Sequence, residues 1–214
     1  MTVVLIIYAT FMLAYMTIKA LGITQPYRGL VKVCLSTTFL GVGAYYVAIN
    51  GWQIVDILLG VALVFAWIGD FLLIYKHKSN MFHAGCTAFG VANAFLVAHS
   101  VLKYTWQWWS LILFAVFMAT IIYCQYKNMF SFGRSKWYLN FYSVTVGYNG
   151  FLGLAVALTT KTIPALFFGL GSLLFLASDI VLGLFLFKIK KWQMDAFNTL
   201  LYFSGLMLIA LSLA

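Results

Sequence analysis

The chain has 214 residues, of which 64% are hydrophobic and only 8% are charged, and its mean hydropathy is +1.01. Ordinary soluble domains carry about 25% charged residues, so this composition excludes that class. The formal net charge of +9 could indicate a nucleic-acid partner, but the basic residues lie between apolar runs, where they flank a lipid surface. We therefore expect an integral membrane protein with membrane lipids as its surroundings and no nucleic-acid partner.

The chain consists almost entirely of apolar runs separated by short polar turns. A run of about 20 apolar residues crosses a bilayer as an α-helix. Eight such runs cover roughly residues 3–21, 30–49, 53–75, 82–102, 106–126, 137–158, 162–187 and 195–213. The sequence therefore predicts an all-α membrane protein in which residues 1–214 form a single domain, a bundle of eight transmembrane helices.

The basic residues are distributed very unevenly over the turns. Of the 13 basic residues only Lys103 and Lys161 flank even-numbered turns. The others flank the odd-numbered turns: Lys19, Arg28, Lys32, Lys76, Lys78, Lys127, Arg134, Lys136, Lys188, Lys190 and Lys191. Because cytoplasmic loops are enriched in Lys and Arg, the odd-numbered turns are expected in the cytoplasm, with both termini on the non-cytoplasmic side.

Two apolar runs each contain an aspartate well inside the hydrocarbon stretch. Asp70 lies in Ala66-Trp-Ile-Gly-Asp-Phe-Leu-Leu-Ile74, and Asp179 lies in the run from Gly169 to Leu182. A carboxylate at membrane depth is energetically costly and usually marks a functional site. At a rise of 1.5 Å per residue, Asp70 is about 9 Å and Asp179 about 13 Å from the basic end of its helix. The two carboxyls should share one layer, which we take as the candidate functional site.

Further polar residues fall on neighbouring helices near this layer or closer to the midplane. As candidate substrate-binding residues we select Lys32, Asn93, Tyr142, Asn149, Ser178, Asn198 and Tyr202. Each also has a structural interpretation, because Asn and Tyr often hydrogen-bond between membrane helices. In the same way, Asp70 or Asp179 could be a structural ion-pair partner of Lys32. The sequence leaves both interpretations open.

The remaining ionisable residues indicate neither a metal site nor a disulfide. The three cysteines lie inside apolar runs without a CxxC spacing, and the three histidines are scattered. A zinc site would need three or four convergent ligands. Asp56, near the outer end of its run, and Asp195, beside a basic turn, are expected to be surface charges.

Several short motifs follow one another along the chain: Lys32, then Gly69-Asp70, Phe89-Gly-Val-Ala-Asn-Ala-Phe95, Gly171-Ser-Leu-Leu-Phe-Leu-Ala-Ser-Asp179 and Tyr202-Phe-Ser-Gly205. Their order resembles that of the YhhN-like lysoplasmalogenase family of integral membrane alkenyl ether hydrolases. It covers most of the chain and includes the number of helices. In one place the chain departs from the family, which usually has a histidine where this chain has Asn93.

The resemblance implies hydrolysis of the vinyl ether bond of a lysoplasmalogen, a lysophospholipid held in the bilayer. The products would be a fatty aldehyde and glycerophosphoethanolamine or glycerophosphocholine, and no cofactor would be needed. Asp70 and Asp179 would serve as acid and base, since an enol ether is cleaved by protonation and capture of an oxocarbenium ion by water. The sequence does not assign the two roles. A bacterial plasma membrane is the expected location.

A second function class is compatible with the same two aspartates. Buried carboxyls also relay protons or bind cations in small transporters and channels. Such proteins often contain inverted repeats with broken helices, which this sequence lacks. The discriminating observation is whether the purified protein turns over lysoplasmalogen without an ion gradient.

Overall fold

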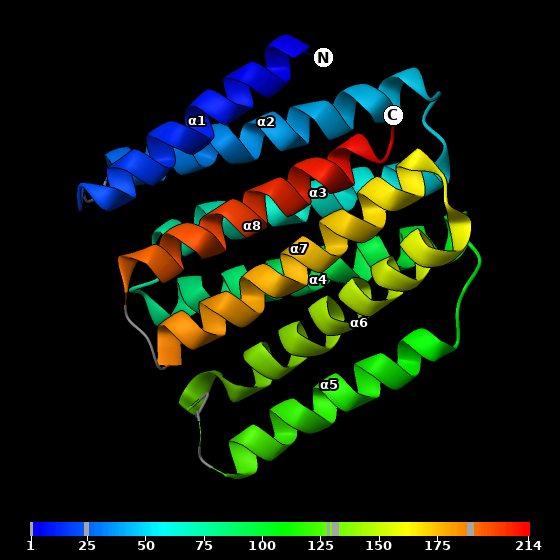
Figure 1. Ribbon diagram of the computed structural model, residues 1–214. Helices are drawn as coiled ribbons and strands as arrows, with labels where there is room; N and C mark the ends of the chain where they lie inside the picture. Colours follow the sequence, from blue (N-terminus) through cyan, green and yellow to red (C-terminus); the bar gives the residue numbers. More distant parts are fainter. Residues whose placement is uncertain (1, 24–25, 128, 130–132, 188–190) are drawn as a thin grey trace.

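A computed structural model of the chain describes residues 2–23, 26–127, 129, 133–187 and 191–214. The described residues form eight α-helices, one short 3₁₀ turn at Gly133–Ser135 and no strand (Figure 1). The helices are α1 Thr2–Ala20, α2 Tyr27–Ile49, α3 Ile54–Ile74, α4 Ser79–Lys103, α5 Trp109–Tyr126, α6 Lys136–Thr160, α7 Ile163–Phe187 and α8 Trp192–Leu211.

The predicted all-helical architecture is confirmed. All eight helices are long and apolar enough to cross a membrane, and each covers one of the predicted runs. The largest differences are three residues, all at helix starts: α5 begins three residues after the predicted start at 106, whereas α2, α4 and α8 begin three residues before the predicted starts at 30, 82 and 195. Polar residues at a membrane surface can continue a helix beyond its apolar segment, so hydropathy alone places the starts of α2, α4 and α8 too late.

Both termini lie at one end of the bundle, and the odd-numbered turns lie at the other (Figure 1). This follows from eight helices that alternate in direction. The end that carries the odd-numbered turns is called the basic end below, because most basic residues flank those turns. The cytoplasmic location of this end remains a prediction from its charge.

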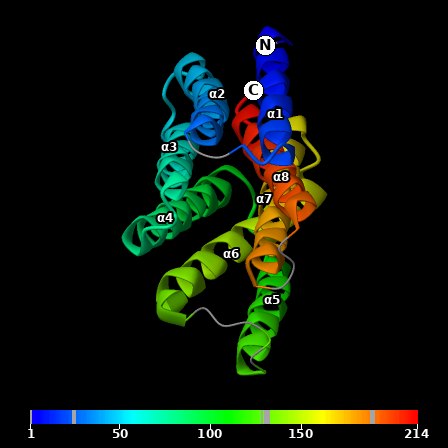
Figure 2. The ribbon, with the colours of Figure 1, turned by 90° about the vertical axis from the view of Figure 1, so that its left-hand side faces the viewer.

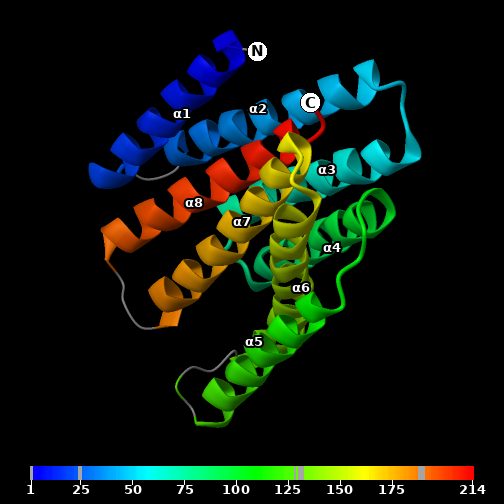
Figure 3. The same cartoon turned by 45° about the vertical axis from the view of Figure 1, so that its right-hand side comes forward.

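Six of the helices form a closed ring. In order around it, α2 packs against α3, α3 against α4, α4 against α6, α6 against α7, α7 against α8, and α8 against α2. The remaining two helices lie outside this ring, α1 against α2 and α8, and α5 against α6. Figures 2 and 3 show α1 and α5 on opposite sides of the bundle.

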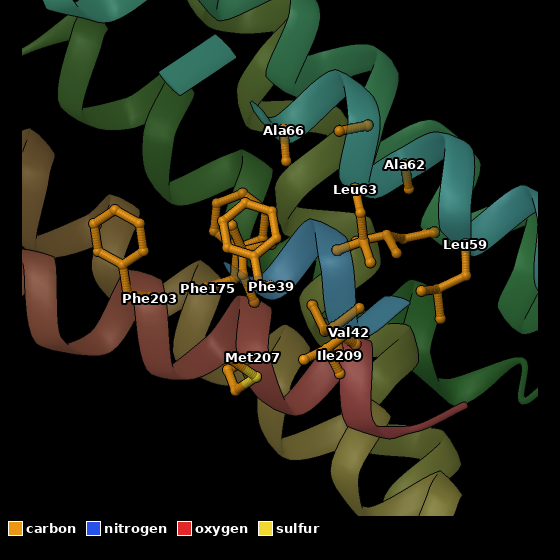
Figure 4. Close-up of a cluster of buried hydrophobic side chains, with 14 of the residues drawn as sticks. Phe39, Val42, Leu59, Ala62, Leu63, Ala66, Phe175, Phe203, Met207 and Ile209 are labelled. Atoms are coloured by element: carbon orange, nitrogen blue, oxygen red, sulfur yellow. The ribbon is translucent and has the colours of Figure 1, made fainter. Parts of the chain in front are cut away.

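Large apolar side chains fill the interior between α2, α3, α7 and α8. Phe39, Leu63, Phe175 and Ile209 are fully buried, and Phe203 is almost so. Figure 4 shows these side chains pointing toward one another from the four helices. Because lipid is as apolar as the protein interior, such packing, and not exclusion of water, holds membrane helices together.

Helices α7 and α8 approach each other closely at a pair of glycines. A Cβ atom added to Gly171 would lie 2.7 Å from the backbone oxygen of Gly205, and one added to Gly205 would lie 2.8 Å from that of Gly171. Both distances are shorter than real Cβ contacts. Small residues here bring the two backbones together and set the position of Asp179 relative to α8.

Replacing Gly171 by Ala is therefore expected to destabilise the protein. The added methyl meets backbone atoms, which cannot rotate away, and such overpacking costs about 1–3 kcal/mol. A matched control is Gly183→Ala on the same helix, where an added Cβ meets nothing within 4 Å. Thermal unfolding in detergent should show a lower Tm for Gly171→Ala than for Gly183→Ala. Equal melting temperatures would show that the close approach is not required.

Candidate active site

A cavity of about 220 Å³ lies at the basic end of the bundle. All helices except α5 contribute to its described lining, together with the turn after α3. Its wall is mixed: apolar side chains from α3, α4, α6 and α7 stand beside a group of acidic, basic and hydroxyl side chains. Of the residues predicted from sequence, those in this lining are Lys32, Asp70, Tyr142, Asp179, Asn198 and Tyr202. Both candidate catalytic carboxyls thus face one cavity.

Asp70 is held by polar groups from α2. Its carboxylate is 1% exposed, and Oδ1 lies 2.9 Å from the Lys32 Nζ. Ser36 donates a hydrogen bond to Oδ2 at 2.5 Å. An ammonium group in contact and a hydroxyl donor both favour the ionised carboxylate. Asp70 is therefore placed as an anion whose charge Lys32 balances.

Asp179 has a different environment. It lies in the cavity lining and is partly exposed there. The hydroxyl of Tyr142 donates a hydrogen bond of 2.7 Å to its Oδ2. Among the described residues no lysine, arginine or histidine forms an ion pair with it. A carboxyl removed from bulk water without a cation is favoured in its neutral, protonated form.

The cavity thus combines two carboxyls whose surroundings favour opposite protonation states. Tyr202 stands in the same lining, and its buried hydroxyl lies near Asp70 but has no partner with normal hydrogen-bond geometry among the described residues. It is free to bind a substrate oxygen or a water. Chemically, the arrangement can donate a proton from Asp179 and stabilise a cation beside Asp70.

Three of the predicted substrate-binding residues lie outside the cavity lining. Asn149 donates to the Asn93 Oδ1 at 3.0 Å, and Asn93 donates to the Phe89 carbonyl at 2.9 Å. Both asparagines are completely buried, and so is Ser178. Ser178 donates to the Phe175 carbonyl at 2.7 Å in its own helix. The structural interpretation, hydrogen bonding between and within helices, fits these three residues.

The sequence analysis was wrong about Asp195, which is not a solvated surface charge. Its carboxylate lines the cavity, is 16% exposed, and accepts ion pairs from Lys19 at 2.9 Å and from Arg28 at 2.8 Å. Lys19 also donates to the Thr199 hydroxyl. The sequence showed the excess of cations at the basic end of the bundle, but it did not show that α1, α2 and α8 meet there.

Asp56 is likewise not a surface charge, because it is only 4% exposed. It pairs with Lys103 at 3.1 Å and accepts a hydrogen bond from Asn50 at 3.0 Å, at the end of the bundle opposite to the basic end. His99 is buried near it and contacts the Val55 carbonyl. No group of three or more potential metal ligands converges among the described residues.

A scan against protein-family models matches residues 29–213 to the YhhN family. The chain belongs to the YhhN family. The match extends from the second helix to the end of the eighth, so it includes both carboxyls, Lys32 and Tyr142. No curated protein and no solved structure gives a significant match. In the described part of this YhhN-family protein, eight helices are long and apolar enough to span a membrane, and a cavity lined by both carboxyls and cations lies at the basic end.

Proposed function

We propose that this YhhN-family protein hydrolyses the vinyl ether bond of lysoplasmalogens in the membrane. The products would be a fatty aldehyde and glycerophosphoethanolamine or glycerophosphocholine. The observation that carries the proposal is the pair of carboxyls in one cavity, one balanced by Lys32 and one without a cation. The proposal includes a multi-pass protein of a bacterial plasma membrane as the setting.

Asp179 acts as the general acid. It transfers its proton to the vinyl carbon remote from the ether oxygen, while the double bond shifts to form an oxocarbenium ion. The Asp179 carboxylate that remains is held by the Tyr142 hydroxyl. Oxocarbenium-like states are also what the carboxylate pairs of glycosidases stabilise.

Asp70 stabilises the cation. As a carboxylate fixed by Lys32 and Ser36, it offers negative charge without rearrangement when the positive charge develops. Water then attacks the cationic carbon and gives its proton to the Asp179 carboxylate, which restores the acid. The resulting hemiacetal loses its hydroxyl proton and breaks its bond to the glycerol oxygen, which takes up a proton. The products are one aldehyde and one alcohol, and one water is consumed.

The cavity wall suits a single-chain lipid. Leu73, Phe82, Leu139 and Leu182 form apolar parts of the lining, beside the carboxyls. The charged residues Lys19, Arg28, Lys76 and Asp195 belong to helix ends and a turn at the basic end, and basic helix ends are typical of the membrane surface. An alkenyl chain would therefore lie among apolar side chains, and the glycerophosphate group would lie among the charges.

Proton transfer to carbon makes a specific prediction for hydrolysis in heavy water. The acidic proton of Asp179 exchanges with solvent, so the aldehyde should contain one deuterium on the carbon next to the carbonyl. Mass spectrometry after immediate reduction of the aldehyde to the alcohol measures this. Aldehyde without deuterium would exclude acid-catalysed addition, and no aldehyde at all would refute the proposed hydrolase.

Tyr142 is proposed as a positioning residue for Asp179. Tyr142→Phe removes the only hydroxyl that contacts the acid among the described residues and keeps the ring. We expect kcat to fall about 10–100-fold, as when a supporting group around a catalytic centre is lost, with little change in KM. A change confined to KM would instead place Tyr142 among the substrate contacts.

A further inference from the structure

The basic end of the cavity contains more positive than negative groups. Among the described residues its lining has four cations, Lys19, Arg28, Lys32 and Lys76, and three carboxyls. Lys32 is balanced by Asp70. Asp195 is the single carboxylate among the described residues that forms ion pairs with Lys19 and Arg28, one through each of its two oxygens. One carboxylate shared by two cations leaves a net positive charge in a half-enclosed space.

Lys76 adds to this excess. It lies in the turn directly after α3 and forms no ion pair with a carboxylate among the described residues. Lys76 is exposed to solvent, but the protein around it still lowers its pKa, and the nearby cations Arg28 and Lys32 lower the pKa further, against the opposing effect of Asp195. The surroundings of this lysine thus disfavour its charged form, and a bound anion would stabilise that form.

We propose that Lys19, Arg28 and Lys76 form a binding site for the phosphodiester of a single-chain phospholipid, with Asp195 as a built-in competitor for two of them. Arg28 supplies the planar guanidinium that pairs with two phosphate oxygens, and the lysines supply point charges. Asp195 occupies Lys19 and Arg28 when no phosphate is bound. The substrate class rests on the proposed function, but the binding of the phosphate does not require hydrolysis.

The placement in the fold supports a lipid head group as the source of this phosphate. Arg28 belongs to α2, which also contributes Lys32, and Asp195 belongs to α8, which also contributes Tyr202. The cationic group and the two carboxyls therefore line one continuous cavity, with the cations toward the surface turns. A phosphate held there is joined through glycerol to an ether group deeper in the cavity.

Two substitutions with opposite expected effects on lipid affinity test this arrangement. Lys76→Gln removes an attractive charge and should weaken binding of a phosphorylated lipid about fivefold, as for a half-exposed ion pair. Asp195→Asn removes the competitor and should tighten binding of the same lipid. The matched control is Lys78→Gln, which makes the same charge change two residues later, in a residue outside the cavity lining.

Binding is measured by the thermal stabilisation of nanodisc-embedded protein with increasing ligand. The probes are a lysophospholipid with a saturated ether chain, which cannot be hydrolysed at a vinyl ether, the corresponding alkylglycerol without phosphate, and inorganic phosphate. We expect the lysophospholipid to bind more tightly than the alkylglycerol, and Lys76→Gln to affect only the lysophospholipid.

Three results would overturn the assignment. The first is equal binding of both lipids by the wild type, and the second is an equal effect of Lys76→Gln and Lys78→Gln on binding. The third is stronger stabilisation by inorganic phosphate than by the lysophospholipid, which would assign the site to free phosphate. If Asp195→Asn does not fold, the comparison of Lys76→Gln with Lys78→Gln still tests whether the phosphate binds at this site. A failed hydrolase assay with the vinyl ether lipid would refute the proposed function and leave this binding result unaffected.

Discussion

Asp179→Asn is expected to abolish fatty-aldehyde release while the protein stays folded. Loss of a general acid costs about 10²–10⁴-fold in rate. Asn has nearly the same shape as Asp and can still accept the Tyr142 hydrogen bond of 2.7 Å. Because Asp179 has no ion pair among the described residues, the substitution leaves no cation without a partner. The measurement is the initial rate of aldehyde release, beside thermal unfolding and gel filtration of the same sample.

The control is Asp56→Asn, the same chemical change at the opposite end of the bundle, where the carboxylate pairs with Lys103. This variant should retain turnover, because Asp56 lies outside the cavity that holds Asp70 and Asp179. Turnover by Asp179→Asn at the wild-type rate would contradict the assignment of the acid.

Lys32→Met is expected to destabilise the protein by about 3–5 kcal/mol, the usual effect of removing one partner of a buried ion pair. The Asp70 carboxylate is 1% exposed and would lose the ammonium at 2.9 Å. Ser36 would remain as its hydrogen-bond donor. Met has a similar length and keeps the apolar part of the Lys32 packing. Thermal unfolding of the purified variant measures the effect.

The double variant Lys32→Met with Asp70→Asn separates charge from packing. Removing both charges leaves no unpaired ion, so the double variant should be more stable than either single variant. A double variant as unstable as the sum of the single ones would show that Lys32 and Asp70 do not act as a pair. Activity should remain absent in it, because the stabilising anion is gone.

The sequence was sufficient to predict the helices but not their neighbours. Apolar length predicts that a segment crosses the membrane, and eight such segments were found. It does not predict packing, because a lipid-facing side chain and a core side chain are equally apolar. Helix α5 shows this: its hydropathy resembles that of α4, yet α5 lies outside the ring and packs against α6, whereas α4 lies in the ring between α3 and α6.

The position of the candidate site along the membrane normal was predictable from the sequence, but the identity of all its lining residues was not. The cost of a charge in lipid identified Asp70 and Asp179, and both line the cavity. Asn149 lies on the same helical face as Tyr142 but two turns deeper, beyond the end of the cavity, where it contacts Asn93. Ser178 is next to Asp179 in sequence, so its side chain points about 100° away around the helix. Contacts among distant helices, such as Lys19 with Asp195, have no local signal in the sequence.

The most direct test of the central claim is aldehyde release from lysoplasmalogen by purified wild-type protein in detergent, where no ion gradient can exist. The proposed hydrolase predicts steady release of one aldehyde and one glycerophospho-alcohol per lipid consumed. Absence of release from correctly folded protein would contradict the proposed function. The Asp70–Lys32 pair and Asp179 would then be better explained as parts of a proton- or cation-coupled transport site.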